Sequence, residues 1–81
     1  MINDYVIQSI IFDNAYNSYE ESLRWVLEHG YNPIKCDFTT NYFRFRIKEP
    51  SIIEKQGYNI YRNKVFDKNK NRMFVIAYRW L

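Results

Sequence analysis

The chain has 81 residues, 47% of them hydrophobic, which suits one small domain with its own core and excludes a disordered tail. A single cysteine excludes an intrachain disulfide and a zinc site made of several thiolates. The net charge of +3 is uneven, because residues 1–40 carry two basic and six acidic side chains, whereas residues 41–81 carry ten basic and three acidic ones.

Hydrophobic periodicity and chain-breaking residues predict the elements of this domain. Strands are expected over residues 5–12, 34–38, 42–48, 58–66 and 72–80, and helices over residues 18–29 and, more briefly, 51–56. The order β-α-β-β-short α-β-β indicates an α+β fold in which residues 1–81 form a single domain. We expect an antiparallel sheet of about five strands with one long helix packed on a face.

Both helices have start and stop signals. Residues 18–21 fit a capping box, in which the Ser18 hydroxyl accepts from the Glu21 amide while the Glu21 carboxylate reaches back. Gly30 is the expected left-handed stop, and a second capping box over 51–54 would start the short helix that Gly57 closes. The stripe expected to face the sheet is formed by Tyr19, Leu23, Val26 and Leu27, with Trp25 beside it.

The strand 42–48 alternates apolar and basic residues. Its geometry sends one set of side chains, Phe43, Phe45 and Ile47, toward the core and the other set, Tyr42, Arg44, Arg46 and Lys48, to the opposite face. Cations on one face at a spacing of about 7 Å can follow a phosphate backbone, and Tyr42 can stack on a base. The competing interpretation is an ordinary solvated sheet face whose cations pair with neighbouring acids.

A second basic cluster surrounds the predicted hairpin and consists of Arg62, Lys64, Lys68, Lys70 and Arg72. If the hairpin lies beside the strand 42–48, the two clusters form one continuous patch for nucleic acid. The alternative is a solubilising turn of the kind common on small domains. The aromatic residues of the hairpin can act as stacking platforms, although aromatic cross-strand pairs are commoner in sheets.

The sequence offers little for catalysis, so we expect no enzyme activity, cofactor or metal. His29 precedes the helix-ending glycine, where it would serve the helix dipole and cap, and Cys36 is expected to be a small buried hydrophobe. Only two glycines are present, and no phosphate-binding loop or metalloprotease motif occurs. An enzyme hypothesis would need a pocket around His29 and Cys36.

Three segments together resemble a known but poorly characterised family. They are Trp25-Val26-Leu27-Glu28-His29-Gly30-Tyr31, Asn41-Tyr42-Phe43-Arg44-Phe45-Arg46 and Glu49-Pro50. This combination is similar to a small domain of proteins from large DNA viruses and tailed phages, over about residues 18–78. The hairpin departs from the family, because 67–71 replaces a glycine-containing turn. The resemblance implies a viral protein of the kind found in virions, and it extends to Arg44 and Arg46 without giving their role.

Together these features predict a virus-encoded protein that binds DNA, rather than RNA, with little sequence specificity and acts as a homodimer. The expected location is the virion or the host cytoplasm or nucleus, because no apolar run approaches the roughly 20 residues of a membrane span and no secretion signal is apparent. The alternative is a protein–protein interaction module of a virion or host-takeover complex, with Trp25, Tyr42 and Trp80 as its anchors.

Overall fold

The computed structural model describes the backbone of residues 2–80 and the side chains of residues 4–80. The elements are β1 (Ile2–Asp13), α1 (Tyr19–Glu28), β2 (Lys35–Phe38), β3 (Tyr42–Arg46), α2 (Pro50–Lys55), β4 (Ile60–Asp67) and β5 (Arg72–Trp80). The α+β class with a five-stranded antiparallel sheet is confirmed. Neither described helix has the length or apolar content that a membrane crossing requires.

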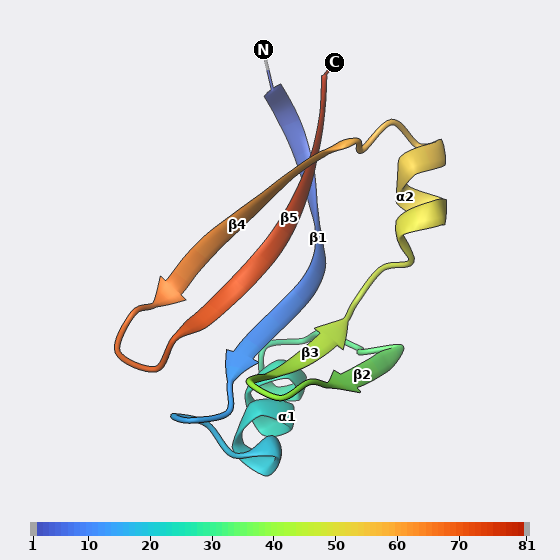
Figure 1. The fold of residues 1–81 in the computed structure, drawn as a ribbon. Coiled ribbons are helices and arrows are strands. Elements are labelled where there is room, and N and C mark those ends of the chain that lie inside the picture. Colours follow the sequence, from blue (N-terminus) through green and yellow to red (C-terminus); the bar gives the residue numbers. More distant parts are fainter. Residues whose placement is uncertain (1, 81) are drawn as a thin grey trace.

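The sheet has the strand order β2-β3-β1-β5-β4, with the long strand β1 at its centre (Figure 1). β5 pairs with β1 from Ile2 to Phe12, whereas β3 pairs only with its second half, from Ser9 to Asp13. One end of the sheet therefore contains all the strands. The other end, where both termini lie, contains only β1, β5 and β4 (Figure 1).

α1 covers one face at the end of the sheet that holds all the strands. Its Val26 packs into a cluster with the buried side chains of Ile10, Phe12 and Phe45. Trp25 flanks the stripe, as expected, and its ring stacks on Phe66 with the centroids 4.8 Å apart. This side of the sheet is called the α1 face below.

The expectation of one long helix is not borne out, because α1 has only ten residues. The short second helix was expected, and α2 has six residues. The Ser18 hydroxyl caps α1 by accepting from the Glu21 amide, and it also donates to the Glu21 carboxylate. Gly30 ends the turn with a φ of +83°. Leu27 was expected to face the sheet but is 52% exposed, so this assignment was wrong.

α2 covers the opposite face at the other end of the sheet. Val6, Ala77 and Tyr61 lie opposite one another on β1, β5 and β4, and they pack with Ile53 and Tyr58. The helix begins at Pro50 after Glu49, with no side-chain cap, so the second capping box was predicted wrongly. Because the two helices cover opposite faces at opposite ends, each face keeps one open end.

A β-bulge in β1 places Gln8 between the regions covered by the two helices. Ile7 lies opposite Ile76 and Ser9 lies opposite Val75, so Gln8 is the extra residue of β1. Its backbone carbonyl accepts from the amides of Ile47 and Lys48 at 2.8 and 3.2 Å. β3 therefore ends at Arg46, rather than at Lys48 as predicted, and the chain leaves the sheet there.

A polar cluster closes the α2 side of the sheet near the termini. The Asp4 carboxylate accepts from the Tyr58 hydroxyl at 2.8 Å and from Arg79 Nε at 2.7 Å. The Arg79 guanidinium also lies 4.7 Å from the centre of the Tyr58 ring. The hydrogen bond from Tyr58 and the charge and hydrogen bond of Arg79 lower the pKa of Asp4 against a partial desolvation that raises it.

This cluster predicts a pH-dependent effect of Asp4→Asn. Because the folded-state pKa lies below the ordinary value of 3.8, ionised Asp4 stabilises the fold at neutral pH, and this contribution is lost as the pH falls through the lowered pKa. Thermal unfolding followed by circular dichroism should show a lower melting temperature for the variant at neutral pH and a much smaller deficit in strong acid. An equal deficit at both pH values would contradict a role for the charge.

Candidate nucleic-acid interface

Arg44 and Arg46 of β3 lie on the face opposite α1, as their alternation with Phe43 and Phe45 predicts. Arg44 is paired across the sheet with Ile11 of β1, and Arg46 is paired with Ser9. On the other side they lie opposite Asp37 and Lys35 of the edge strand β2. One acid of the first half of the chain, Asp37, is therefore a direct neighbour of these arginines.

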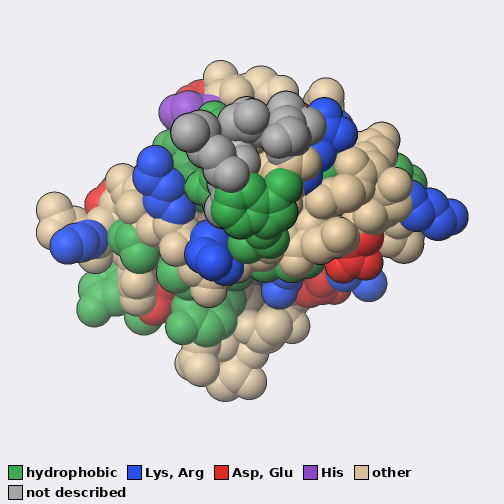
Figure 2. Space-filling view, turned by 90° about the horizontal axis from the view of Figure 1, so that it is seen from above, with side chains coloured by type: hydrophobic (Ala, Val, Ile, Leu, Met, Phe, Trp, Pro, Cys, Tyr) green, Lys and Arg blue, Asp and Glu red, His purple; other side chains and the backbone are tan. Residues whose placement is uncertain are grey.

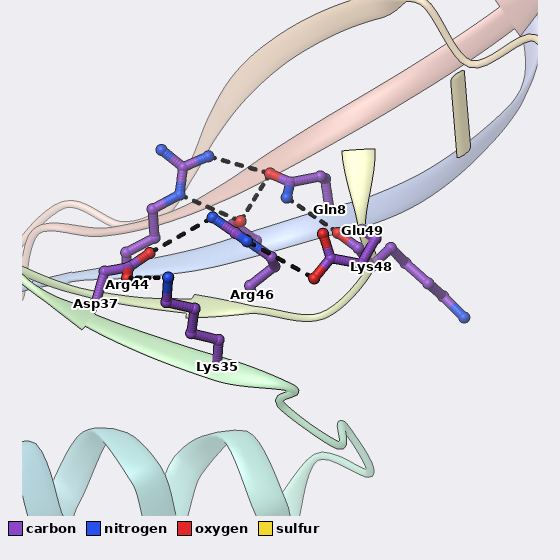
Figure 3. A network of polar contacts seen from close by, with 8 residues as sticks. Gln8, Lys35, Asp37, Arg44, Arg46, Lys48 and Glu49 are labelled. Carbon is purple, nitrogen blue, oxygen red and sulfur yellow. Dashed lines mark hydrogen bonds and ion pairs between the residues drawn. The ribbon is translucent and has the colours of Figure 1, made fainter. Parts of the chain in front are cut away.

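Arg44 is held by polar side chains of the central strand (Figure 3). Its Nη2 donates to Gln8 Oε1 at 3.1 Å, and its Nε donates to Ser9 Oγ at 3.3 Å. Gln8 and Ser9 are almost fully buried and need such partners, because an unpaired buried polar group costs about 1–3 kcal/mol. Arg44 thus provides hydrogen bonds to the buried oxygens of Gln8 and Ser9, and a phosphate would have to compete with these contacts.

Arg46 lies between two carboxylates (Figure 3). Its guanidinium is 3.7 Å from Asp37 Oδ2 and 3.7 Å from Glu49 Oε1, while the Lys35 ammonium is 3.4 Å from Asp37 Oδ1. Counting Arg44, this group holds three cations and two anions, so most of its charge is neutralised locally. It fits the interpretation of a solvated face with paired acids better than that of a phosphate-binding row.

Arg72 of the hairpin is a structural residue. Its side chain is 14% exposed, and it is 3.7 Å from Asp67 Oδ2. Its Nε donates to Asn17 Oδ1 at 2.8 Å, and its guanidinium lies 5.7 Å from the centre of the Phe12 ring. Arg72 therefore attaches the hairpin to the turn after β1 and is poorly placed to contact a ligand.

The other predicted cations of the hairpin are exposed. Arg62 and Lys64 lie on the edge strand β4, and Lys68 and Lys70 lie in the turn after it. Among the described residues, none of these four forms an ion pair with a carboxylate. Their charge therefore remains available to an anionic partner.

The two basic clusters do not form one continuous patch, because the hairpin does not lie beside β3. β1 and β5 separate β3 from β4. Lys64 lies opposite Phe74, which lies opposite Ile10 of the α1 core, whereas Arg44 lies opposite Ile11. Residues that are direct cross-strand partners share a face, so the hairpin cations and the β3 arginines project from opposite sides of the sheet.

Lys48 does not join the β3 arginines either. It follows the end of β3, and its side chain points away from the network of Arg44 and Arg46 (Figure 3). It lines a groove on the α1 side of the molecule instead. Tyr42 is 37% exposed and lies opposite Asp13, at the end of the sheet remote from this groove.

The groove of Lys48 was not predicted from the sequence. It has a volume of about 480 Å³ and is lined by Tyr5, Val6, Ile7, Gly30, Tyr31, Asn32, Ile47 and Lys48. Its walls come from the first half of β1, the turn after α1 and the residues after β3. No two of these segments are adjacent in the chain, so no local pattern predicts the groove. The one sequence signal for it is the aromatic ring of Tyr5 in the first strand.

The surroundings of the groove combine aromatic rings with basic side chains. Tyr5 is 59% exposed, and its ring centroid is 5.9 Å from that of Tyr78 on β5. Arg62 lies opposite Ile76, which lies opposite Ile7 in the groove. Figure 2 views the end of the molecule where the termini lie and shows Lys and Arg side chains on both sides of exposed hydrophobic side chains.

His29 and Cys36 both have structural surroundings, at the end of α1 and against the α1 core. His29 is the C-cap residue of α1, its Nδ1 is 2.7 Å from the Trp25 carbonyl oxygen, and its ring stacks on the indole. Burial and the nearby Asp37 charge raise the pKa of the Cys36 thiol, which disfavours the reactive thiolate. In the described part of the chain, no group of three or more His, Cys, Asp or Glu is placed to hold a metal ion.

Comparisons of this chain with protein-family models, with curated proteins and with solved structures gave no match.

The contrast between Arg72 and Arg62 predicts different effects on stability. Arg72→Ala removes a hydrogen bond and an ion pair of a mostly buried side chain, so it should lower the free energy of unfolding by about 1–3 kcal/mol. Arg62→Ala changes an exposed edge position and should stay within about 0.5 kcal/mol of the wild type. Urea unfolding followed by tryptophan fluorescence measures both values, and equal losses would refute the distinction.

Proposed function

We propose that this protein binds nucleic acid with little base preference through the open end of its α1 face. The observation that carries the proposal is a group of exposed cations that have no carboxylate partner among the described residues. Arg62 and Lys48 lie near the rings of Tyr5 and Tyr78, and Lys64 lies two residues further along β4 on the same face. Cations supply attraction to phosphates, and aromatic rings supply stacking that tolerates any base.

The proposal gives the predicted residues different roles. Arg62, Lys64 and Lys48 would contact phosphates, with Lys68 and Lys70 adding long-range attraction from the turn. The remaining predicted residues, Arg44, Arg46, Arg72 and Tyr42, are left out of the proposed interface, because the arginines are committed to internal partners and Tyr42 lies at the far end of the sheet.

The proposed partner is DNA, and the proposed setting is a virion or a host cell that a virus has infected. Both follow from the resemblance of the chain to a domain of large DNA viruses and tailed phages. A second copy of the chain would double the number of phosphate contacts, and we retain the homodimer as part of the proposal.

A protein–protein interaction module is the second candidate, and exposed hydrophobic side chains favour it. Trp80 and Phe38 are 60% and 64% exposed, so each offers an aromatic surface that a protein partner could cover. Trp25 is no longer a suitable anchor, because it packs on Phe12, Phe66 and Phe74. This candidate predicts a partner whose binding survives the loss of Arg62 and Lys64.

A salt series with the double variant Arg62→Ala/Lys64→Ala tests the proposed function. If each side chain neutralises one phosphate, the slope of log affinity against log salt should become shallower by about 1.4–1.8, and binding at low salt should weaken. Fluorescence anisotropy with a labelled oligonucleotide measures both quantities.

The matched control is Arg24→Ala/Lys55→Ala, which removes one arginine and one lysine that are equally exposed on α1 and α2. It should leave the salt slope nearly unchanged. Equal losses in the two double variants would mean that binding reflects net charge rather than this surface. Absence of binding by the wild type at low salt would reject the proposal.

A further inference from the structure

The groove exists because α1 ends before it covers its face of the sheet. Gly30 turns the chain with a positive φ, and the Tyr31 amide then donates to the Val26 carbonyl at 3.1 Å. This turn holds the Tyr31 ring against Trp25 and Phe74, at centroid distances of 6.5 and 6.4 Å. Beyond Tyr31, no helix of the described chain covers the α1 face, and the groove opens there.

The lining of the groove suits a flat, largely apolar ring. Tyr5 and Tyr31 contribute aromatic walls, and Ile7 and Ile47 contribute aliphatic surface. The volume of about 480 Å³ exceeds what one side chain of a neighbouring loop would fill. The polar side-chain groups of the lining residues are the Asn32 amide, the Lys48 ammonium and the hydroxyls of Tyr5 and Tyr31, so the groove offers apolar surface together with hydrogen-bonding groups that can orient a ring.

The charge of the groove selects an anionic ligand. Lys48 lies in its lining, no carboxylate does, and Arg62 is two strands away on the same face, about 10 Å from Ile7 at the backbone. The long Arg62 side chain can span much of the distance between its backbone and the groove. A ring attached to a phosphodiester meets both requirements, since the ring fills the groove while its phosphates reach the two cations.

We infer that this groove binds an unpaired nucleobase, so that the protein prefers single-stranded over double-stranded nucleic acid. The inference rests on the proposed function and specifies its substrate. In a duplex the bases are stacked and paired, and bringing one out costs a few kilocalories per mole, whereas a single strand presents its bases freely. Tyr5 is the principal stacking residue, and Lys48 holds the adjacent phosphate.

The test compares a labelled single strand, a duplex of equal length and an abasic strand of equal charge, at one low salt concentration. Wild-type protein should bind the single strand most tightly. Because stacking on an aromatic side chain is worth roughly fivefold to 150-fold in affinity, Tyr5→Leu should lose about that factor for the single strand and little for the duplex or the abasic strand. Lys48→Gln should weaken binding of the single strand, whose phosphate Lys48 is proposed to hold.

The matched control is Tyr16→Leu. Tyr16 is 59% exposed, as Tyr5 is, but it lies in the turn at the other end of β1, so its replacement should leave all three affinities unchanged. The abasic strand tests the same idea on the unaltered protein and does not depend on the folding of a variant. Equal wild-type affinity for the abasic and the normal strand would overturn the inference.

The result also separates the inference from the proposed function. If Tyr5→Leu leaves single-strand binding intact while Arg62→Ala/Lys64→Ala weakens it, the groove is not a base site and the cationic surface stands. If duplex binds more tightly than the single strand, the stated preference is wrong. If the wild type binds no nucleic acid, both proposals fail.

Discussion

The buried side chain of Gln8 is the constraint on which the arrangement of charges depends. The bulge puts a carboxamide that is 1% exposed in the centre of the sheet, and its hydrogen-bonding atoms must find partners there. Arg44 and Ser9 bond its oxygen, and its Nε2 donates to the Lys48 carbonyl. Gln8 thus holds the Arg44 side chain by a hydrogen bond. It also binds the backbone of Lys48, whose side chain lines the groove.

Neutralisation and segregation of charge both occur in this fold. Acids of the first half of the chain pair with basic residues of the second, as Asp4 does with Arg79 and Asp37 with Arg46. The positive charge left over is concentrated on the edge strand β4 and the following turn, where Arg62 and Lys64 have no carboxylate partner among the described residues. The proposed function therefore depends on the cations of β4, and not on the regularly alternating arginines of β3.

Local patterns predicted most of the fold. The order of elements, the Ser18 cap, the positive φ of Gly30 and Gly57, and the alternation of β3 depend on neighbouring residues, and each of them is found in the structure. The start of α2 was not predicted correctly, because a rigid Pro50 overrode the serine that follows it.

The candidate site could not be predicted in the same way. The side chains to which Arg44 and Arg72 donate hydrogen bonds are 35 to 55 residues away in the chain, so no local pattern reveals that these arginines have internal partners. Strand order decides which clusters share a face, and hydrophobic alternation does not determine it. The groove needs both the bulge at Gln8 and the turn at Gly30. The turn is a local feature, but the bulge and the position of the turn over the sheet depend on tertiary contacts.

The central claim is that the α1 face, rather than the face of Arg44 and Arg46, meets nucleic acid. An NMR titration of backbone amide shifts with a short single-stranded oligonucleotide tests it most directly. The account predicts that the largest changes fall on Tyr5, Ile7, Tyr31, Lys48 and the first half of β4. Changes centred on β2 and β3 at Lys35, Asp37 and Arg46, with the groove residues unmoved, would contradict it.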